Sequence, residues 1–360
     1  MTMMDEMTQR MKVLTECDGV PGHEGAVRAQ MKSYLEPLSE ELVMDRLGSV
    51  FGVKTGLAGG PKVMLAGHLD EIGFMVTQIT PKGFLRFNQL GGWWAHNVLS
   101  HRVKVKTRKG EYIGIIGSKP PHVLEAEERT KVMKLKDLYI DIGAKDEADA
   151  KEMGVRPGDW VVPVSDFFTM RDGELWAGKA LDNRSGCSLA VEILSRLQNE
   201  QHPNVIYAGA TVQEEVGLRG AGTAANLIQP DVAFALDVGI AHDTPGSESN
   251  PMKCNMGGGP LVLIFDASMI PNTALRDLVI DTAEESGISV QFDAITGGTT
   301  DGGRIHTSGI GCPTLSVGFA TRYIHSHNSV MSKSDFSQAA DLLTAVIKKL
   351  DRETVDKLIG

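Results

Sequence analysis

Two adjacent glutamates, Glu214 and Glu215, follow an apolar, β-rich run in the stretch TVQEEVGLRG. Neighbouring residues on a strand point to opposite faces of the sheet. Two carboxylates that lie close together repel each other unless a positive charge lies between them. The pair therefore predicts a site that holds a cation.

Residues able to bind a metal ion also follow three other apolar runs. His68 follows VMLAG, Asp237 follows VAFAL, and His325 follows PTLSVGFATRYI. Asp182 opens the helix expected after LWAGKAL. Ligands of open α/β sheets gather at the carboxyl ends of the strands, so we expect these residues to meet in one crevice.

Each residue has a simpler interpretation when it is taken alone. An Asp at a helix start, such as Asp182, is most often an N-cap. A His beside Gly, such as His68, is usually a turn or core residue, and a Glu pair at a strand end is usually solvated. Together, two histidines and three carboxylates at element ends are what a two-metal site requires, with a carboxylate such as Asp182 as the bridge.

The ligand types narrow the metal and the reaction. Oxygen and imidazole ligands without thiolate favour Zn, Co or Mn over copper or an iron–sulfur cluster. If Glu215 binds a metal ion, Glu214 faces the water held by that ion and takes its proton as general base. A glycosidase arrangement fits less well, because its two carboxylates flank one bond at about 5–9.5 Å while neighbours on a strand diverge.

Composition limits the class of protein. The chain has 360 residues, enough for two domains, and its net charge of −10 argues against nucleic acid or an anionic membrane as a partner. We see no signal peptide, and no run approaches the ~20 apolar residues of a membrane span. The cysteines at positions 17, 187, 254 and 312 are far apart, which favours free thiols and a cytoplasmic location.

The elements that position the site alternate between strands and helices. The first 45 residues read as helical, and a buried strand ends near Gly67. From about residue 75 to 165, short β-rich pieces alternate with Gly and Pro, which predicts a small inserted β-barrel or sandwich. After Phe168, alternation implies a mainly parallel sheet covered by helices. The strands expected there are 204–213, 231–239, 289–295 and 313–319, and the helices are 182–198, 273–287 and 334–350.

Six stretches of the chain carry a resemblance: AGHLDEIGFMV, GKALDNRSG, VQEEVGLRGA, ALDVG, GGTTDGGRIH and RYIHSH. In this order they resemble the tetrahedral (TET-type) aminopeptidases, a family of co-catalytic metallo-exopeptidases that includes bacterial glutamyl aminopeptidases. The resemblance covers the chain from about residue 15 to its end. It implies an enzyme that removes N-terminal residues from short peptides with two divalent ions, Zn or Co, with Mn as a further option.

The resemblance also implies a ligand set. One ion would be held by His68, Asp182 and Asp237. The other would be held by Glu215 and His325, with Asp182 as the bridge.

Further roles follow from the same resemblance. Glu214 would be the general base, and Asp70, in the pattern His-x-Asp, would hydrogen-bond the imidazole of His68 and orient it. Residues 73–165 would form a dimerisation domain. The rest of the chain, 1–72 and 166–360, would form the catalytic domain, and dimers would assemble into a tetrahedral dodecamer that encloses the active sites.

Several other polar residues lie in or near these motifs. The pattern Arg-Tyr-x-His-Ser selects His325 and leaves His327 as a surface residue. His242 is expected near the substrate groove. Asp301 either receives the free amine of a peptide or shapes a Gly-rich turn, and His306 is expected to be structural.

Two other functions remain open: another metal-dependent hydrolase, such as a deacylase or a glycanase, and a metal-binding scaffold without activity. Glu214 argues against a scaffold, because a metal store has no use for a carboxylate that is not a ligand. The preferred P1 residue also stays open, since an acidic one needs a cation in the pocket and a basic one needs a carboxylate. The candidates for that role are Arg304, Arg322, Asp243 and Asp301.

Overall fold

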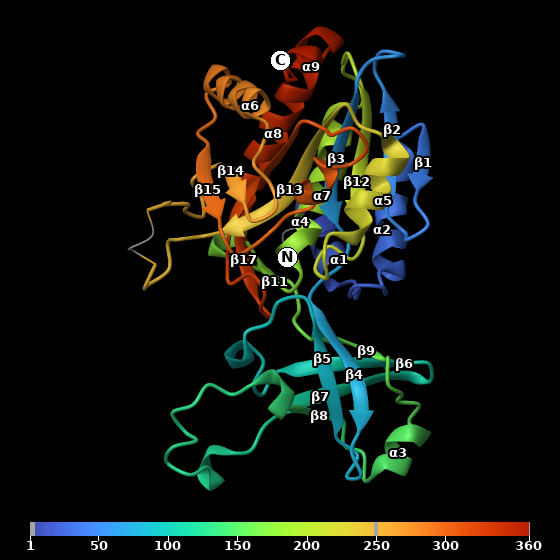
Figure 1. Cartoon of the computed structure of the whole chain (residues 1–360), viewed down its shortest axis with the longest axis vertical. Coiled ribbons are helices and arrows are strands. Elements are labelled where there is room, and N and C mark those ends of the chain that lie inside the picture. The colour runs from blue at the N-terminus through green and yellow to red at the C-terminus, as the bar shows by residue number, and fades with distance from the viewer. Residues whose placement is uncertain (1–3, 248–250, 360) are drawn as a thin grey trace.

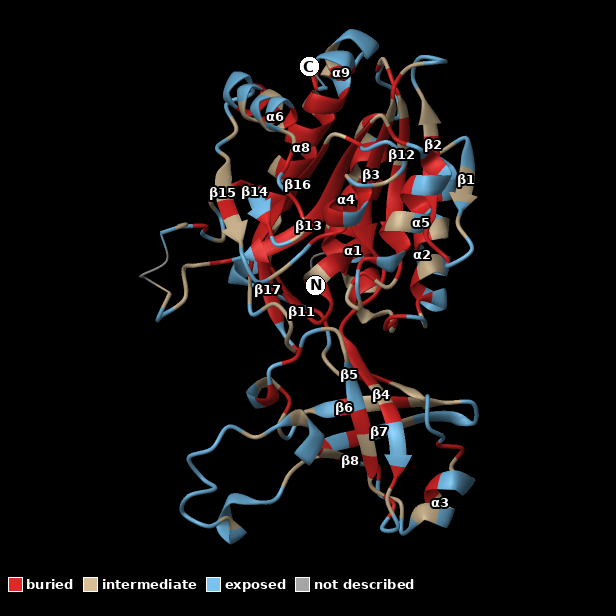
Figure 2. Ribbon diagram, viewed as in Figure 1, coloured by how far each residue is buried: buried red, intermediate tan, exposed pale blue. Residues whose placement is uncertain are grey.

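The computed structural model describes residues 4–247 and 251–359. Figure 1 shows two bodies: an α/β domain built around a large sheet, and a smaller β-barrel below it. Buried residues fill the sheet and the inside of the barrel, whereas the long loops of the barrel are exposed (Figure 2). All four cysteines are free thiols.

The large sheet gathers strands from both ends of the sequence. In spatial order they are β1 (Glu41–Met44), β2 (Val50–Thr55), β12 (Val205–Thr211), β3 (Lys62–His68), β13 (Val232–Ile240), β16 (Thr314–Arg322), β17 (Ser329–Ser332), β11 (Leu175–Gly178) and β10 (Phe168–Met170). β14 (Pro260–Asp266) pairs with β16 and with β15 (Gln291–Ile295). The sheet therefore joins segments that are far apart in the chain.

The centre of the sheet is parallel. β12, β3, β13 and β16 run side by side in one direction, while the strands that flank them pair antiparallel. Antiparallel neighbours need only a short connection, as between β1 and β2, whereas the parallel ones need long crossovers. The predicted α/β class with an inserted barrel is confirmed, and the complete sheet is mixed.

Helices cover both faces of this sheet. One face carries the larger core and is covered mainly by α1 (Glu6–Glu16), α4 (Leu181–Arg196) and α8 (Lys333–Lys349). Around them lie α2 (Gly25–Leu35), α6 (Thr273–Glu285) and α9 (Arg352–Lys357). The other face is covered by α5 (Arg219–Ile228) and α7 (Gly302–Ile305). The strands and helices predicted after Phe168 are all present within a few residues, whereas others there, such as α5 and β14, were not predicted. The predicted helix up to residue 45 is wrong at its end, since β1 pairs with β2 there.

β3 shows why a strand of the central sheet reads as a continuous apolar run. Val63 and Leu65 pack in the core under α1, α4 and α8, and Met64 and Ala66 pack in the core under α5 and α7. Successive side chains on a strand point to opposite faces, so a strand with helices on both faces needs apolar residues at every position. The run ends at His68, the last residue of the strand.

The barrel starts directly after this end of β3. Its strands close in the order β4 (Gly73–Ile79), β5 (Leu85–Leu90), β8 (Tyr139–Asp141), β7 (Gly110–Gly117), β6 (Arg102–Thr107) and β9 (Trp160–Pro163), and α3 (Glu147–Glu152) lies beside them. The barrel has an apolar core of its own, with Phe74 stacked on Trp93 at a centroid distance of 4.8 Å. Because β4 begins five residues after β3 ends, the carboxyl end of β3 faces the barrel.

Candidate metal centre

Six of the predicted site residues lie together at this edge of the sheet, and we call them the metal centre. They are His68, Asp182, Glu214, Glu215, Asp237 and His325, and all of them line one cavity of about 610 Å³. They come from β3, the start of α4, the loop after β12, the interior of β13 and the loop after β16. The carboxyl ends of the parallel strands therefore bring them to one place.

Asp182 occupies the middle of the metal centre. Its Oδ1 lies 3.2 Å from Nε2 of His68, and its Oδ2 lies 3.3 Å from Nε2 of His325. The N-cap position of α4 is occupied by Ala180, so the N-cap interpretation of Asp182 is wrong. One carboxylate thus spans two imidazoles from separate strands, as a bridging ligand must.

The two glutamates diverge toward different histidines. Oε2 of Glu214 lies 3.8 Å from Nε2 of His68, and Oε1 of Glu215 lies 3.4 Å from Nε2 of His325. The expected cause, opposite faces of a strand, is wrong: β12 ends at Thr211, and the pair lies in the following loop. Gln213, which precedes the pair, has a positive φ of 56° and redirects the chain there.

Asp70 fixes this loop. The backbone N–H groups of Glu214 and Glu215 donate to its Oδ1 and Oδ2, both at 3.0 Å. Nδ1 of His68 lies 3.0 Å from the carbonyl oxygen of Asp70 and 3.6 Å from its Oδ1. A proton on Nδ1 that is donated to this carbonyl leaves Nε2 with its lone pair directed at the metal centre.

Glu24, which sequence reasoning missed, is the residue before α2 and supports the same loop. It is 3% exposed, and its Oε1 accepts hydrogen bonds from the backbone N–H groups of Gly22 at 2.7 Å and Gln213 at 3.2 Å. The stretch GHEG that contains it reads as an ordinary helix start. No local signal distinguishes it, because its partner is far away in the sequence.

Charge in the metal centre is unbalanced. Burial, helped by neighbouring acids, raises the pKa of Glu214 and of Asp237 well above the ordinary values. Burial alone would lower the pKa of His325, but the carboxylates of Asp182 and Glu215 raise it to about 11. Crowded acids that resist ionisation are the expected state of a site whose balancing charge comes from a cation.

The donor set fits divalent cations. His68, Glu214 and Asp237 offer ligand atoms that all lie within 4.8 Å of one another, and so do His68, Asp182 and Glu215. Oε1 of Glu215 is buried and has no hydrogen-bond partner among the described residues. Carboxylate oxygen and imidazole nitrogen without thiolate are ligands for Zn, Co or Mn.

Comparison with known proteins gives the family. A family model described as M42 glutamyl aminopeptidase matches residues 48–342. The chain belongs to the M42 glutamyl aminopeptidase family. The resemblance found in the sequence is thereby confirmed, and the chain is an aminopeptidase, a hydrolase that acts as an exopeptidase, of a family that uses divalent metal.

Relatives extend over almost the whole chain. The glutamyl aminopeptidase of Lactococcus lactis subsp. cremoris is 34% identical over 98% of this chain and 99% of its own. The solved TET aminopeptidase of a marine sediment thaumarchaeon is 45% identical, with a TM-score of 0.96 over 99% of this chain and 100% of that one. The TET1 peptidase of Pyrococcus horikoshii, reported to assemble into a tetrahedron or a large octahedral shell, is 30% identical, with a TM-score of 0.84 over 96% of this chain and 100% of its own.

Two of the other predicted residues of this aminopeptidase differ in their burial: Asp301 is buried and His306 is half-buried. Asp301 is 2% exposed, receives a hydrogen bond from the hydroxyl of Thr211, and has its pKa raised to about 7 by burial. His306 donates from Nδ1 to the carbonyl of Gly302 at 2.9 Å. Neither residue lines the cavity described above.

The prediction that His327 is a surface residue is wrong. It is 2% exposed, and its ring stacks on His101 of the barrel at a centroid distance of 3.8 Å. Trp93, also from the barrel side, lies against it at 5.4 Å. Burial lowers the pKa of His327 to about 3, so the ring stays neutral. The barrel covers this position, and the local sequence contains no sign of that.

The cavity continues away from the metal centre along β13 and β15. Its wall there includes Ile240, His242 and Asp293, followed by residues 294–300. His242 lies at this wall, where the sequence placed it. Asp293 was missed because it lies inside a segment that reads as a buried strand. The signal that could have identified Asp293 as a functional residue is an acidic side chain within an apolar run.

Within residues 4–247 and 251–359, every helix is too short or too polar to span a bilayer.

Proposed function

We propose that this aminopeptidase is dinuclear and removes N-terminal residues from short peptides, with Glu214 as general base. The carboxylate of Asp182 carries the proposal, since its two oxygens reach His68 and His325 at nearly equal distances. A mononuclear site has no need for such a bridge. Two separate structural ion pairs would not converge on one cavity.

The residues divide between two divalent ions, Zn or Co, with Mn as a further option. His68 and Asp237 would hold one ion, Glu215 and His325 would hold the other, and Asp182 would bind both. When bound, the ions would polarise the scissile carbonyl and lower the pKa of the attacking water.

Glu214 has the position of a base. Its side chain lines the cavity beside His68 and Asp237, so it reaches a water at that position. It takes the proton of the attacking water and later donates it to the leaving amine, which restores the carboxylate. Asp70 keeps the Glu214–Glu215 loop in place through its two hydrogen bonds, so it acts as a positioning residue.

Residues 73–165 are proposed as a dimerisation domain, and residues 1–72 and 166–360 as the catalytic domain. The barrel side of the molecule exposes large apolar side chains, which large interfaces bury. These are Trp94, Ile113, Ile115, Val123 and Val132, each more than half exposed. Together with the tetrahedron or large octahedral shell reported for the Pyrococcus relative, these side chains support our proposal of a homododecamer built from dimers. We propose a cytoplasmic location because the four cysteines are free thiols. Sedimentation should show a species far larger than the 38.8 kDa chain, and a monomer at micromolar concentration would refute the assembly alone.

A substrate panel tests the reaction. Amino-acid p-nitroanilides, N-acetylated peptides and cellulose would each be offered to protein loaded with Zn, Co or Mn. We expect hydrolysis only of substrates with a free amino terminus. Release of acetate or of reducing sugar, with intact p-nitroanilides, would instead support a deacylase or a glycanase.

A further inference from the structure

The wall of the cavity opposite the metal centre contains an unusual group, the carboxylate of Asp293. The residue lies in the middle of β15 and is 2% exposed. Its Oδ1 accepts a hydrogen bond from the backbone N–H of Ala294 at 2.8 Å. Its Oδ2 is buried and has no hydrogen-bond partner among the described residues. A buried carboxylate oxygen without a donor is costly, so its retention in a cavity wall indicates a ligand that supplies the donor.

His242 lies next to this oxygen without satisfying it. Its Nε2 is 3.5 Å from Oδ2 of Asp293, at the outer limit of a hydrogen bond. Gly239 of β13 also lies near this oxygen: a Cβ added to it would clash with Cδ2 of Leu261 at 2.0 Å and would lie 3.9 Å from the oxygen. The oxygen thus has a polar neighbour, His242, and its residue is among those that line the cavity.

The rest of this wall is apolar or neutral. Ile240 is the last residue of β13, Ile295 is the last residue of β15, and Thr296 follows Ile295. None of the described residues that line the cavity is Lys or Arg. A cavity of about 610 Å³ has room for a long side chain whose methylene groups pack on the two isoleucines.

The four charged candidates named from the sequence do not fill this role. Arg322 donates two hydrogen bonds to Asp243, at 2.7 and 2.6 Å, so these two charges neutralise each other. Oδ2 of Asp301 accepts a hydrogen bond from the hydroxyl of Thr211, and the residue does not line the cavity. Arg304 lies in α7 and does not line the cavity. Asp293 is therefore the acid that faces the substrate space on this side.

We propose that Asp293, oriented by His242, is the residue that selects the P1 side chain, and that it selects a basic one, lysyl or arginyl. The aliphatic stem packs on Ile240 and Ile295, and the terminal cation donates to Oδ2 of Asp293. An acidic P1 side chain is rejected, because it would bring a second negative charge to a buried carboxylate. This inference rests on the proposed aminopeptidase activity and names its substrate class.

The test compares P1 side chains that differ in their terminal charge. kcat/KM would be measured with the metal-loaded protein for the p-nitroanilides of lysine, arginine, norleucine and glutamate. Norleucine has the same chain as lysine without the ammonium group. A charged hydrogen bond predicts that the lysyl substrate exceeds the norleucyl one by roughly 10- to 100-fold, with the glutamyl substrate poorest.

Asp293→Asn removes the charge with little change of shape and should bring the lysyl-to-norleucyl ratio close to 1. The matched control is Asp281→Asn, an exposed residue of α6, which should leave the ratio as it is. Thermal shifts with the free products give a second readout, since L-lysine should stabilise the native protein more than L-norleucine, and the Asp293→Asn variant should lose this difference.

The outcomes separate the two proposals. A glutamyl or norleucyl substrate cleaved faster than the lysyl one by the native protein would overturn the role of Asp293, whatever the variant does. An unchanged ratio in Asp293→Asn would overturn it as well. Hydrolysis of none of the p-nitroanilides would overturn the aminopeptidase proposal and, with it, this inference.

Discussion

Two groups of buried charges meet at the loop between β3 and β4, and they differ in how their charges are balanced. The metal centre contains four carboxylates around two histidines, and Asp70 lies beside it. The next residue, Glu71, belongs to a second group at the border with the barrel, which we call the junction cluster. It consists of Asp18, Glu71, Lys104, Lys106, Lys179 and Arg184.

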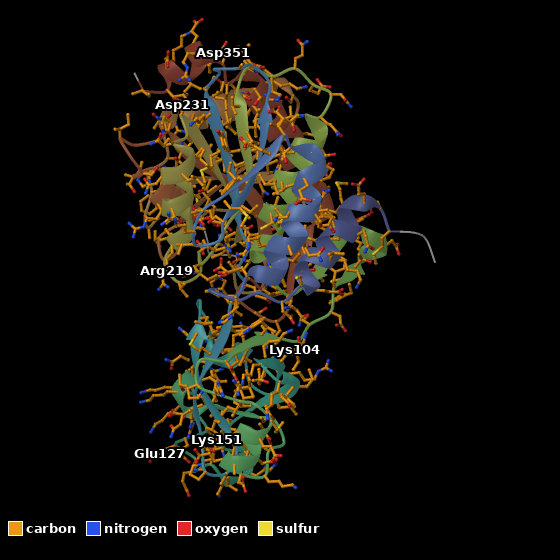
Figure 3. The ribbon with its side chains drawn as sticks, turned by 90° about the vertical axis from the view of Figure 1, so that its right-hand side faces the viewer. Lys104, Glu127, Lys151, Arg219, Asp231 and Asp351 are labelled. Atoms are coloured by element: carbon orange, nitrogen blue, oxygen red, sulfur yellow. The ribbon has the colours of Figure 1, made fainter. Side chains whose placement is uncertain are left out.

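In the junction cluster, each acid is paired with basic side chains of the same cluster. The carboxylate of Asp18 forms ion pairs with three ammonium groups. Nζ of Lys104 and of Lys106, both from the barrel, lie 2.6 and 2.8 Å from its Oδ2, and Nζ of Lys179 from the α/β domain lies 2.9 Å from its Oδ1. Lys179 also lies 2.8 Å from Glu71, whose Oε1 is 3.4 Å from Arg184. In Figure 3, Lys104 lies where the barrel meets the α/β domain, and Asp231 and Asp351 mark the far end of that domain. The cluster therefore ties one body to the other.

The pKa shifts show how the acids of the two groups are balanced. Burial would raise the pKa of Asp18, but Lys179, Lys104 and Lys106 hold it below its ordinary value. Burial, helped by neighbouring acids, raises the pKa values of Glu214 and Asp237, whereas His325 and His68 hold the pKa of Asp182 below its ordinary value despite its burial. The acids of the junction cluster are paired with lysine and arginine, so loss of one partner would leave a charge uncompensated, whereas Glu214 and Asp237 keep raised pKa values in a cavity, as expected of a functional site.

Removal of metal should have the largest effect of the changes considered, and it should act through the metal centre and leave the junction cluster unchanged. Chelation should abolish turnover, and Zn or Co should restore it. The melting temperature should also fall, since a ligand at 100 times its Kd stabilises the native state by about 2.7 kcal/mol. Calorimetry with and without EDTA measures this, and the Asp18→Asn variant should show the same shift as the native protein. Full activity in excess EDTA with no bound metal would contradict a metal-dependent reaction.

Substitution of the two glutamates should separate a base from a ligand. Glu214→Gln keeps the size of the side chain but removes the proton acceptor, so both metals should stay while kcat falls by at least ~10²-fold with little change of KM. Glu215→Gln should lower the occupancy of one metal position, with a loss of thermal stability. Native mass spectrometry and single-turnover rates measure both. Loss of metal from Glu214→Gln with full occupancy in Glu215→Gln would reverse the two roles.

Asp18→Asn should affect stability and leave metal content alone. Three ammonium groups lose their shared partner, so the free energy of unfolding should drop by about 3 kcal/mol. Because the folded pKa of Asp18 lies below the unfolded value of about 3.9, its stabilisation is complete above that pH and is lost as the pH falls below it. Urea unfolding should therefore give a constant difference from the native protein between about pH 5 and 8 and a smaller one below about pH 4. If the difference in unfolding free energy between the native protein and Asp18→Asn grew toward low pH, the pKa of Asp18 would be raised by folding rather than lowered.

Glu111→Gln should have the smallest effect. Glu111 contacts Lys106 and lies 3.8 Å from Lys104, at the outer side of the junction cluster, but its side chain is 53% exposed. Exposed ion pairs contribute about 0–1 kcal/mol because water and salt screen them. Urea unfolding should show a change within about 0.5 kcal/mol. A loss as large as that of Asp18→Asn would show that the cluster acts as one cooperative network.

The sequence by itself determined the features that depend on local patterns. Apolar runs of strand length gave the central strands, and their polar end residues gave the members of the metal centre. His68 is typical: the residues before it must be apolar because helices cover both faces of β3, so the first polar residue marks the strand end. The order of the motifs was enough to identify the family.

Only the tertiary structure decided how these elements face one another. His327 is buried because the barrel covers it with His101, and Asp293 faces the cavity because β15 packs beside β14 at the edge of the sheet. The hydrogen bonds of Asp70 to the Glu214–Glu215 loop span more than 140 residues of sequence. Such contacts leave no periodic pattern, because each one depends on a distant segment whose position is fixed by the packing of the whole core.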